Sequence, residues 1–245
     1  MRLIAHRGRA GSDPENAIES MIRLPPWADG AEVDVQMSSD GVLVAMHDDT
    51  VDRTADGSGR VDELTAGELG ALQLAPGVHV PRVEQYLASF RGTRLPELFI
   101  DVKHPEVQLI DEVVRLVAAA ELSTRCVILA RRAEQLYRAR QLDATLTLGA
   151  LGVTATMAAD RLPELAGLDV DWVFLAPGDA AYGRHRHVIP LLREAGLRVG
   201  GSIIAAPEVL DQLVADGADI VITDRVADLQ SWPWRSSSHR GRRWG

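Results

Sequence analysis

The residues whose types and spacing suit chemistry begin with Glu32 and Asp34, two positions apart in the run "AEVDVQ". Residues two apart in an extended strand project from the same face, so we expect both carboxylates to point to one side. Buried carboxylates repel each other unless a cation compensates their charge. With Asp101 as a third acid, this all-oxygen set indicates Mg²⁺ or Ca²⁺ rather than zinc. Solvation, or pairing with arginine, is the alternative.

Asp101 and Lys103 repeat the same spacing in the run "LFIDVK". Lys103 would add positive charge beside the third carboxylate, which suits contact with a phosphate oxygen. A structural ion pair between the two residues is the alternative. His104 points the opposite way from Lys103 in an extended strand and is expected to be a loop residue.

His6 and His47 each stand at the predicted end of an apolar run. Imidazole titrates near neutrality, so two such residues beside a bound anion suit a general base and a general acid. The guanidinium of Arg7 can fork onto a phosphate. Glu15, in "DPEN", either reaches this site or lies in the first helical turn, and Asn16 suits the N-cap of the helix that follows.

Eight short apolar or β-branched runs alternate with segments of helical periodicity. The runs are residues 2–6, 31–36, 98–103, 125–130, 146–151, 171–176, 197–204 and 219–224. This alternation predicts a parallel sheet, and eight units in 245 residues predict an α/β TIM (β/α)8 barrel. A doubly wound open sheet is the rival fold, but no G-x-G-x-x-G follows the first strand.

Residues 41–49 read as an extra strand, and the polar, Gly-rich stretch at about 50–81 reads as a small insertion after the second barrel strand. An insertion there covers the C-terminal face of a barrel, where active sites form. We expect residues 1–230 to form one domain. The basic tail with Trp and Arg, residues 231–245, reads as an extension, with contact to an acidic partner as the alternative.

The composition narrows the class of protein. The net charge of −9 argues against nucleic acid as a partner, and no run approaches the ~18 apolar residues of a membrane span, so no stable membrane insertion is expected. The single cysteine, Cys126, excludes an internal disulfide and favours a cytoplasmic location. Its apolar surroundings indicate a buried structural thiol. The oligomeric state stays open.

The segments "AHRGRAGSDPENA", "GAEVDVQMSSDGVLVAMHDDTVDRTADGSGRV", "IDVK" and "GADIVITDR" resemble the glycerophosphodiester phosphodiesterase family over most of the chain. The resemblance implies a TIM barrel and an enzyme of lipid and glycerol metabolism that hydrolyses small-molecule glycerophosphodiesters to glycerol 3-phosphate and an alcohol. It also implies a divalent metal, Mg²⁺ or Ca²⁺. In this family the substrate's own adjacent hydroxyl can attack phosphorus and give a cyclic phosphate, which water then opens.

The residues that match the family's motifs are the metal ligands Glu32, Asp34 and Asp101, the catalytic acid–base pair His6 and His47, and the phosphate-contacting Arg7 and Lys103.

Three positions depart from the family's pattern. Asp101 stands where a glutamate is usual, and "LARR" replaces a Ser-Phe pair on strand four, so Arg131 is expected to face the substrate. Residues 202–205 replace the usual Trp-Thr-Val-Asn, so the aromatic wall is missing. The Asp-x-Lys variant is shared with the spider-toxin sphingomyelinase D type, without the disulfides expected there. Phospholipase D-like or lysophospholipase D-type activity on a lipid phosphodiester, or a non-catalytic barrel that binds phosphate esters, therefore remains an alternative.

Overall fold

Apolar strands that alternate with helices close into a parallel barrel in this computed structural model, which describes residues 1–176, 185–204 and 206–231. The barrel strands run in the order β1 (Arg2–Ala5), β2 (Gly30–Met37), β6 (Glu97–Val102), β7 (Cys126–Ala130), β8 (Thr147–Val153), β9 (Trp172–Leu175), β10 (Arg198–Gly201) and β11 (Ile220–Thr223). Strand β1 pairs with both β11 and β2, so the sheet is closed. The predicted TIM barrel is confirmed.

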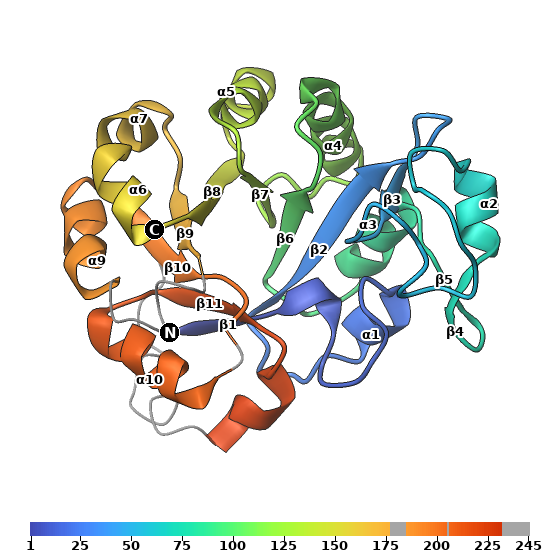
Figure 1. Ribbon diagram of the computed structural model, residues 1–245, viewed down its shortest axis with the longest axis horizontal. Coiled ribbons are helices and arrows are strands. Elements are labelled where there is room, and N and C mark those ends of the chain that lie inside the picture. Colours follow the sequence, from blue (N-terminus) through green and yellow to red (C-terminus); the bar gives the residue numbers. More distant parts are fainter. Residues whose placement is uncertain (177–184, 205, 232–245) are drawn as a thin grey trace.

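The helices lie outside the strands (Figure 1). They are α1 (Ile18–Ile22), α3 (Val83–Arg91), α4 (Val107–Ala119), α5 (Ala133–Leu142), α6 (Ala155–Asp160), α7 (Leu162–Gly167), α9 (His185–Glu194) and α10 (Pro207–Asp216). Helix α10 begins at a proline and ends before Gly217, whose φ of 90° suits glycine at the C-terminal cap. Helix α4 buries Leu109, Val113 and Val117, which are four apart and therefore lie on one face.

The barrel strands have one apolar layer on their outer face, against the helices, and a second one on their inner face. Val33 and Val35 of β2 pack outward against the helices, as their alternation with the acids predicts. Inside the barrel, Phe99, Trp172 and Phe174 form part of a separate core. Because these side chains fill the barrel, polar residues gather at its C-terminal mouth. Cys126 is buried, as predicted.

The chain makes an excursion between β2 and α3 before it returns to the barrel. Strand β3 (Leu43–Ala45), within the predicted extra strand, pairs antiparallel with β2. The helix α2 (Ala66–Ala71) and the strands β4 (Gln73–Ala75) and β5 (Val78–His79) follow. This excursion has a small apolar core of its own, which includes Val44, Met46, Val61 and Leu69. It therefore holds the segment after β3 in a fixed place.

The chain closes with the short helix η2 (Val226–Ser231). The predicted tail, 231–245, lies outside the described residues apart from its first position. None of the helices in the described ranges combines the length and apolar character needed to cross a bilayer.

Candidate active site

The three predicted acids converge at the mouth of the barrel. Glu32 and Asp34 come from β2 and Asp101 from β6, and the register of these strands places Asp34 beside Asp101. One carboxylate oxygen from each lies within 4.8 Å of the others, and each residue is at most 4% exposed. The shared face that the spacing predicts is therefore present.

The cluster carries negative charge that its neighbours compensate only in part. Burial raises the pKa of the Glu32 carboxyl, and the charges of Asp34 and Asp101 raise it further. Burial acts the same way on Asp34, but the charge of Lys103 and other favourable contacts outweigh it and lower that pKa. Lys103 Nζ lies 3.2 Å from Asp34 Oδ1 and 3.2 Å from Asp101 Oδ2. Lys103 thus bridges two of the acids from one side.

Arg131 follows β7 and forks onto Asp101. Its Nη1 and Nη2 donate to the two carboxylate oxygens at 2.7 and 3.0 Å. The expectation from the sequence was contact with substrate, and the structure adds this direct pairing with the third acid. The side chain remains 44% exposed, so part of it still faces the mouth.

His6 begins the short helix η1 (His6–Gly8) directly after β1. Its Nδ1 lies 3.0 Å from Oδ1 of Asp224, which also accepts a bond from Arg9 at 3.0 Å. The hydrogen bond from His6 lowers the pKa of Asp224, so this carboxylate accepts and Nδ1 carries the proton. The second ring nitrogen, Nε2, takes no part in this contact. Asp224 was missed as a site residue in the sequence, although it is the next-to-last residue of the quoted "GADIVITDR" segment.

His47 lies two residues beyond β3 rather than at the strand's end. Its Nδ1 is 2.6 Å from Oδ1 of Asp48. The same carboxylate accepts from Arg53, at 2.5 Å from Nε to Oδ2 and at 3.0 Å from Nη2 to Oδ1. The hydrogen bond from Arg53 lowers the pKa of Asp48. Both predicted catalytic histidines are therefore oriented through Nδ1 by an ionised aspartate.

Arg7 has a backbone conformation that suits few residues, with φ 52° and ψ 31°. This turn directs its backbone N–H to Glu32 Oε2 at 2.8 Å. Its Nη1 donates to Glu15 Oε1 at 2.8 Å, and its Nε lies 3.5 Å from Asp34 Oδ2. Of the two alternatives for Glu15, the structure shows contact with the site, where it also pairs with Arg53 at 2.6 Å.

The expectation that Asn16 caps the following helix is wrong. Ala17, not Asn16, is the N-cap of α1. Asn16 instead has φ 58° and makes two hydrogen bonds to Asp34. Asn16 Nδ2 donates to Asp34 Oδ2 at 2.9 Å, and the Asp34 N–H donates to Asn16 Oδ1 at 3.0 Å. The Asn16 amide thus bonds the buried carboxylate of Asp34 rather than the free N–H groups at the start of the short helix α1. His104 lies in the loop between β6 and α4, as predicted, and its ring contacts the buried Gln36.

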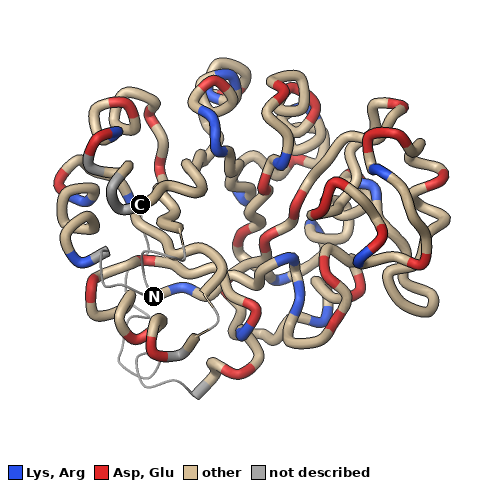
Figure 2. Tube along the Cα trace, in the orientation of Figure 1, with Lys and Arg blue, Asp and Glu red and all other residues tan. Residues whose placement is uncertain are grey.

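A cavity of about 150 Å³ opens beside this cluster. His6, Glu32, Asp101, Arg131 and Ser202 line its polar side, and the apolar side consists of Leu129, Leu151, Ile203 and Ile222 with Gly152. His47 does not line it. Figure 2 shows acidic and basic segments side by side where β2 and β6 lie. The cavity therefore gives access to Glu32 and Asp101, two of the three acids.

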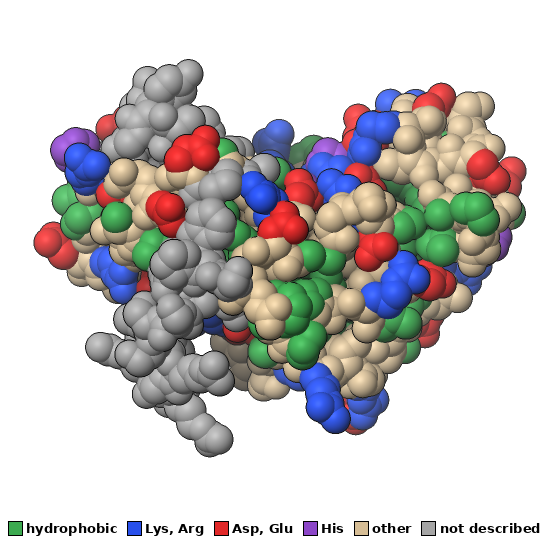
Figure 3. All heavy atoms as spheres, turned by 90° about the horizontal axis from the view of Figure 1, so that it is seen from below, with side chains coloured by type: hydrophobic (Ala, Val, Ile, Leu, Met, Phe, Trp, Pro, Cys, Tyr) green, Lys and Arg blue, Asp and Glu red, His purple; other side chains and the backbone are tan. Residues whose placement is uncertain are grey.

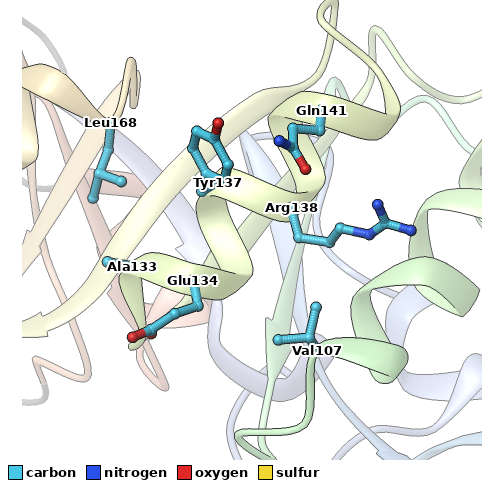
Figure 4. A pocket seen from close by; sticks show the side chains of 7 residues that line it. All are labelled: Val107, Ala133, Glu134, Tyr137, Arg138, Gln141 and Leu168. Atoms are coloured by element: carbon cyan, nitrogen blue, oxygen red, sulfur yellow. The ribbon is translucent and has the colours of Figure 1, made fainter.

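A larger groove of about 430 Å³ lies on the outer surface of the barrel. Figure 4 shows Tyr137, Arg138 and Gln141 projecting into it from α5, with Val107 at the start of α4. None of the predicted site residues lines this groove. We therefore place the candidate site at the mouth, where titratable groups converge.

The donor set at the mouth fits a hard divalent cation. Oxygens bound to one such ion at its usual distances of about 2.0–2.6 Å can lie up to about 5 Å apart, which matches the spacing of the three acids. The raised pKa of Glu32 is a second sign, because a cation would relieve the repulsion that causes it. The residues present therefore fit a metal site.

Three comparisons show which known proteins this chain resembles. Residues 6–228 match the model of the Glycerophosphoryl diester phosphodiesterase family. A glycerophosphodiester phosphodiesterase of Caldanaerobacter subterraneus is 41% identical over 98 residues, which cover 40% of this chain and 37% of that protein. Human glycerophosphodiester phosphodiesterase 1 is 31% identical over 151 residues, which cover 57% and 45%. The matched part thus spans less than half the length of these relatives.

Solved structures share the fold at lower identity. An Oleispira antarctica phosphodiesterase, in complex with the product sn-glycerol-3-phosphate, superposes with a TM-score of 0.78 at 22% identity. The match covers 94% of this chain and 96% of that one. A glycerophosphodiester phosphodiesterase from Agrobacterium tumefaciens has a TM-score of 0.74 at 24% identity, with coverage of 92% and 97%. At these identities the likeness concerns the fold.

Proposed function

This chain belongs to the glycerophosphoryl diester phosphodiesterase family, and we propose that it hydrolyses glycerophosphodiesters to glycerol 3-phosphate and an alcohol. The observation that carries the proposal is the convergence of Glu32, Asp34 and Asp101 at the mouth of the barrel, where Glu32 and Asp101 line one cavity together with His6. Diester hydrolysis needs compensation of the phosphoryl charge and two proton transfers, and this set offers both.

Glu32, Asp34 and Asp101 would hold the metal, with Mg²⁺ or Ca²⁺ as the ions that prefer such ligands. When bound there, the ion would stabilise the negative charge that develops on the phosphoryl oxygens. Asn16 and Lys103 fix the orientation of Asp34, so this ligand is held in place beforehand.

The two histidines would perform the proton transfers. Each is held by an aspartate at Nδ1, Asp224 for His6 and Asp48 for His47, which leaves Nε2 as the working nitrogen. One histidine removes the proton of the attacking hydroxyl, which belongs to water or to the substrate itself; in the second case the product is a cyclic phosphate, which water then opens to glycerol 3-phosphate. The other protonates the alcohol oxygen as its bond to phosphorus breaks. Arg7 would contribute positive charge beside the phosphate.

A direct assay tests this proposal. Purified protein is incubated with glycerophosphocholine and glycerophosphoglycerol in the presence of Mg²⁺ or Ca²⁺, with and without chelator. We expect turnover that chelation removes and added metal restores, and a loss of kcat of about 10²- to 10⁴-fold in His6→Ala and His47→Ala. His79→Ala, on the exposed strand β5, is the matched control and should keep full activity.

Metal-independent turnover, or full activity of both histidine variants, would refute the mechanism. Tight binding of diesters without turnover of any of them would favour the non-catalytic barrel instead.

A lipid phosphodiester is the second candidate substrate, because one side of the cavity is apolar. Leu129, Leu151 and Ile222 form that side, and Ile203 at its edge is 43% exposed with φ 56°, a strained conformation for a β-branched residue. Such a wall suits an alkyl chain. If kcat/KM for lysophosphatidylcholine exceeds that for glycerophosphocholine, and Ile203→Ser lowers only the former, the enzyme is of the lysophospholipase D type.

The partner proposal is limited to such small diesters. Figure 3 shows one face on which acidic and basic side chains are interspersed. The absence of a nucleic-acid partner stays a prediction from the net charge of −9. The cytoplasmic location stays a prediction, which fractionation of cells that produce the protein would test.

A further inference from the structure

Gln36 of β2 contacts the segment that carries His47 without lining the cavity. It lies two positions beyond Asp34 and is completely buried. Strand β3 ends at Ala45, and the Met46 N–H still donates to the Asp34 carbonyl of β2 at 3.1 Å, so His47 is the first residue beyond this pairing. The position of His47 therefore depends on contacts made after the strand has ended.

The side-chain amide of Gln36 supplies such contacts to three consecutive residues. Its Nε2 lies 3.2 Å from the carbonyl oxygen of Met46, 3.0 Å from that of His47 and 2.6 Å from that of Asp48. An amide nitrogen has two protons, so it donates mainly to the two nearer carbonyls, those of His47 and Asp48. The Met46 carbonyl shares one of these protons. These carbonyls belong to the histidine and to the aspartate that orients it.

The orientation of the amide follows from its other end. Gln36 Oε1 lies 3.0 Å from Nε2 of His104. The reversed amide would place its oxygen among three carbonyl oxygens, which repel it, so His104 Nε2 must be the donor. The backbone oxygen of His104 accepts a bond from the buried Gln135 of α5 at 2.7 Å. A continuous set of bonds thus runs from α5 to the loop.

We propose that Gln36 is a positioning residue for His47, and that His104 sets the direction of its amide. The inference rests on the proposed function, because it assigns His47 a proton transfer. Proton transfer is sensitive to placement, and an error of about 1 Å can cost about a hundredfold in rate. The core around Val44 and Met46 stays intact without the amide, so its loss acts locally on residues 46–48.

The first test is Gln36→Met, which keeps the length of the side chain and removes the donors. We expect kcat to fall by about ten- to a hundredfold, while KM and the Kd for Mg²⁺ stay within about twofold. Gln141→Met on the exposed end of α5 is the matched control and should behave as wild type. A kcat of Gln36→Met within twofold of wild type would overturn the proposal.

The second test separates positioning from a general weakening of the fold. In a His47→Ala background, measured with an activated p-nitrophenyl diester, Gln36→Met should cause no further loss, because the residue it positions is gone. An equal loss in both backgrounds would mean that Gln36 acts on the fold in general. His104→Asn should lower kcat less than Gln36→Met, whereas His79→Asn should leave it unchanged.

The third test needs no turnover. Hydrogen exchange of the peptide that covers residues 43–50 should be faster in Gln36→Met than in wild type, with unchanged exchange in α4 and α5. Unchanged exchange at 43–50 would overturn the proposal even if the protein is an active diesterase. Faster exchange in Gln36→Met, found together with a wild-type protein that has no diesterase activity, would leave the anchoring intact and refute the proposed function alone.

Discussion

The two ends of the barrel treat their charges in opposite ways. At the N-terminal floor, Asp171 accepts from the Leu148 N–H at 3.0 Å and from Arg198 and Arg140 at 3.3 and 3.5 Å. Arg198 also lies over the ring of Trp172, 4.2 Å from its centroid. At the mouth, Glu32, Asp34 and Asp101 instead face one another, and burial and repulsion raise the pKa of Glu32.

We infer from this difference that the charges at the N-terminal end stabilise the fold, whereas those at the mouth serve the chemistry of the site. Asp171 at the N-terminal end is paired with neighbouring arginines and a backbone N–H. We therefore expect its substitution to lower stability modestly and to leave activity unchanged. The mouth holds like charges that stabilise nothing by themselves, and such an arrangement is typical of a binding or catalytic site. Substitutions at the two ends should therefore have opposite effects.

The largest effect is expected for Glu32→Gln. Loss of one metal ligand should lower kcat/KM by about 10³-fold, which corresponds to about 4 kcal/mol of charge stabilisation. Stability of the metal-free protein should not fall. Since the folded pKa of Glu32 is raised, its contribution to stability is present below about pH 4.3 and is lost as the pH rises through the folded pKa.

The variant should thus gain stability relative to wild type as the pH rises, which urea unfolding at several pH values would measure. Glu97→Gln at the floor is the matched control, since Glu97 pairs with Arg2. A metal-free Glu32→Gln protein that is less stable at every pH would contradict the comparison.

Asp224→Asn should have the next largest effect. The amide no longer fixes the proton on Nδ1 of His6, so we expect kcat to fall by about ten- to a hundredfold. The folded pKa of Asp224 is lowered, so the stability it contributes is present above about pH 3.9 and is lost as the pH falls through the folded pKa.

The stability difference between Asp224→Asn and wild type should therefore shrink as the medium becomes acidic. Asp219→Asn, just before the other end of β11, is the matched control and should retain kcat. If Asp224→Asn keeps the kcat of wild type, the orientation of His6 does not depend on this contact.

Arg131→Gln should change metal affinity in the direction opposite to a ligand loss. Without the guanidinium, Asp101 is freed from a competing cation, so the Kd for Mg²⁺ should fall by about three- to tenfold. Isothermal titration would measure it, with the adjacent and exposed Arg132→Gln as control. A weaker affinity for Mg²⁺ would show that Arg131 supports the ligand more than it competes.

The smallest effect on activity is expected for Asp171→Asn at the floor. Its contacts are partly exposed, so the free energy of unfolding should fall by about 1 kcal/mol, while kcat and KM stay within about twofold. Thermal unfolding and the diester assay would be measured on the same sample. A marked loss of kcat would break the separation between the two ends.

Much of the site was predictable because its geometry is local. The two-residue spacing of Glu32 and Asp34 defines a shared face, and the order of strands brings Asp101 alongside. The contact between His6 and Asp224 joins residues 218 positions apart and exists only because β11 closes onto β1. The fork of Arg131 onto Asp101 and the amide of Gln36 likewise needed side-chain positions that periodicity does not supply.

Asn16 is a residue for which the local sequence pattern gave a wrong prediction. Its type and place predicted an N-cap, yet the structure directs its amide to Asp34, because tertiary contact with a buried charge overrides a local preference.

The sequence by itself determined the barrel, the faces of its strands and the group of residues at their carboxyl ends, since these follow from backbone repeat and chain order. Only the tertiary structure decided which aspartate holds which histidine and which cation compensates which acid. Such pairings depend on distances across the closed barrel, and hydrogen bonds and charges act over a few ångströms of space rather than along the chain.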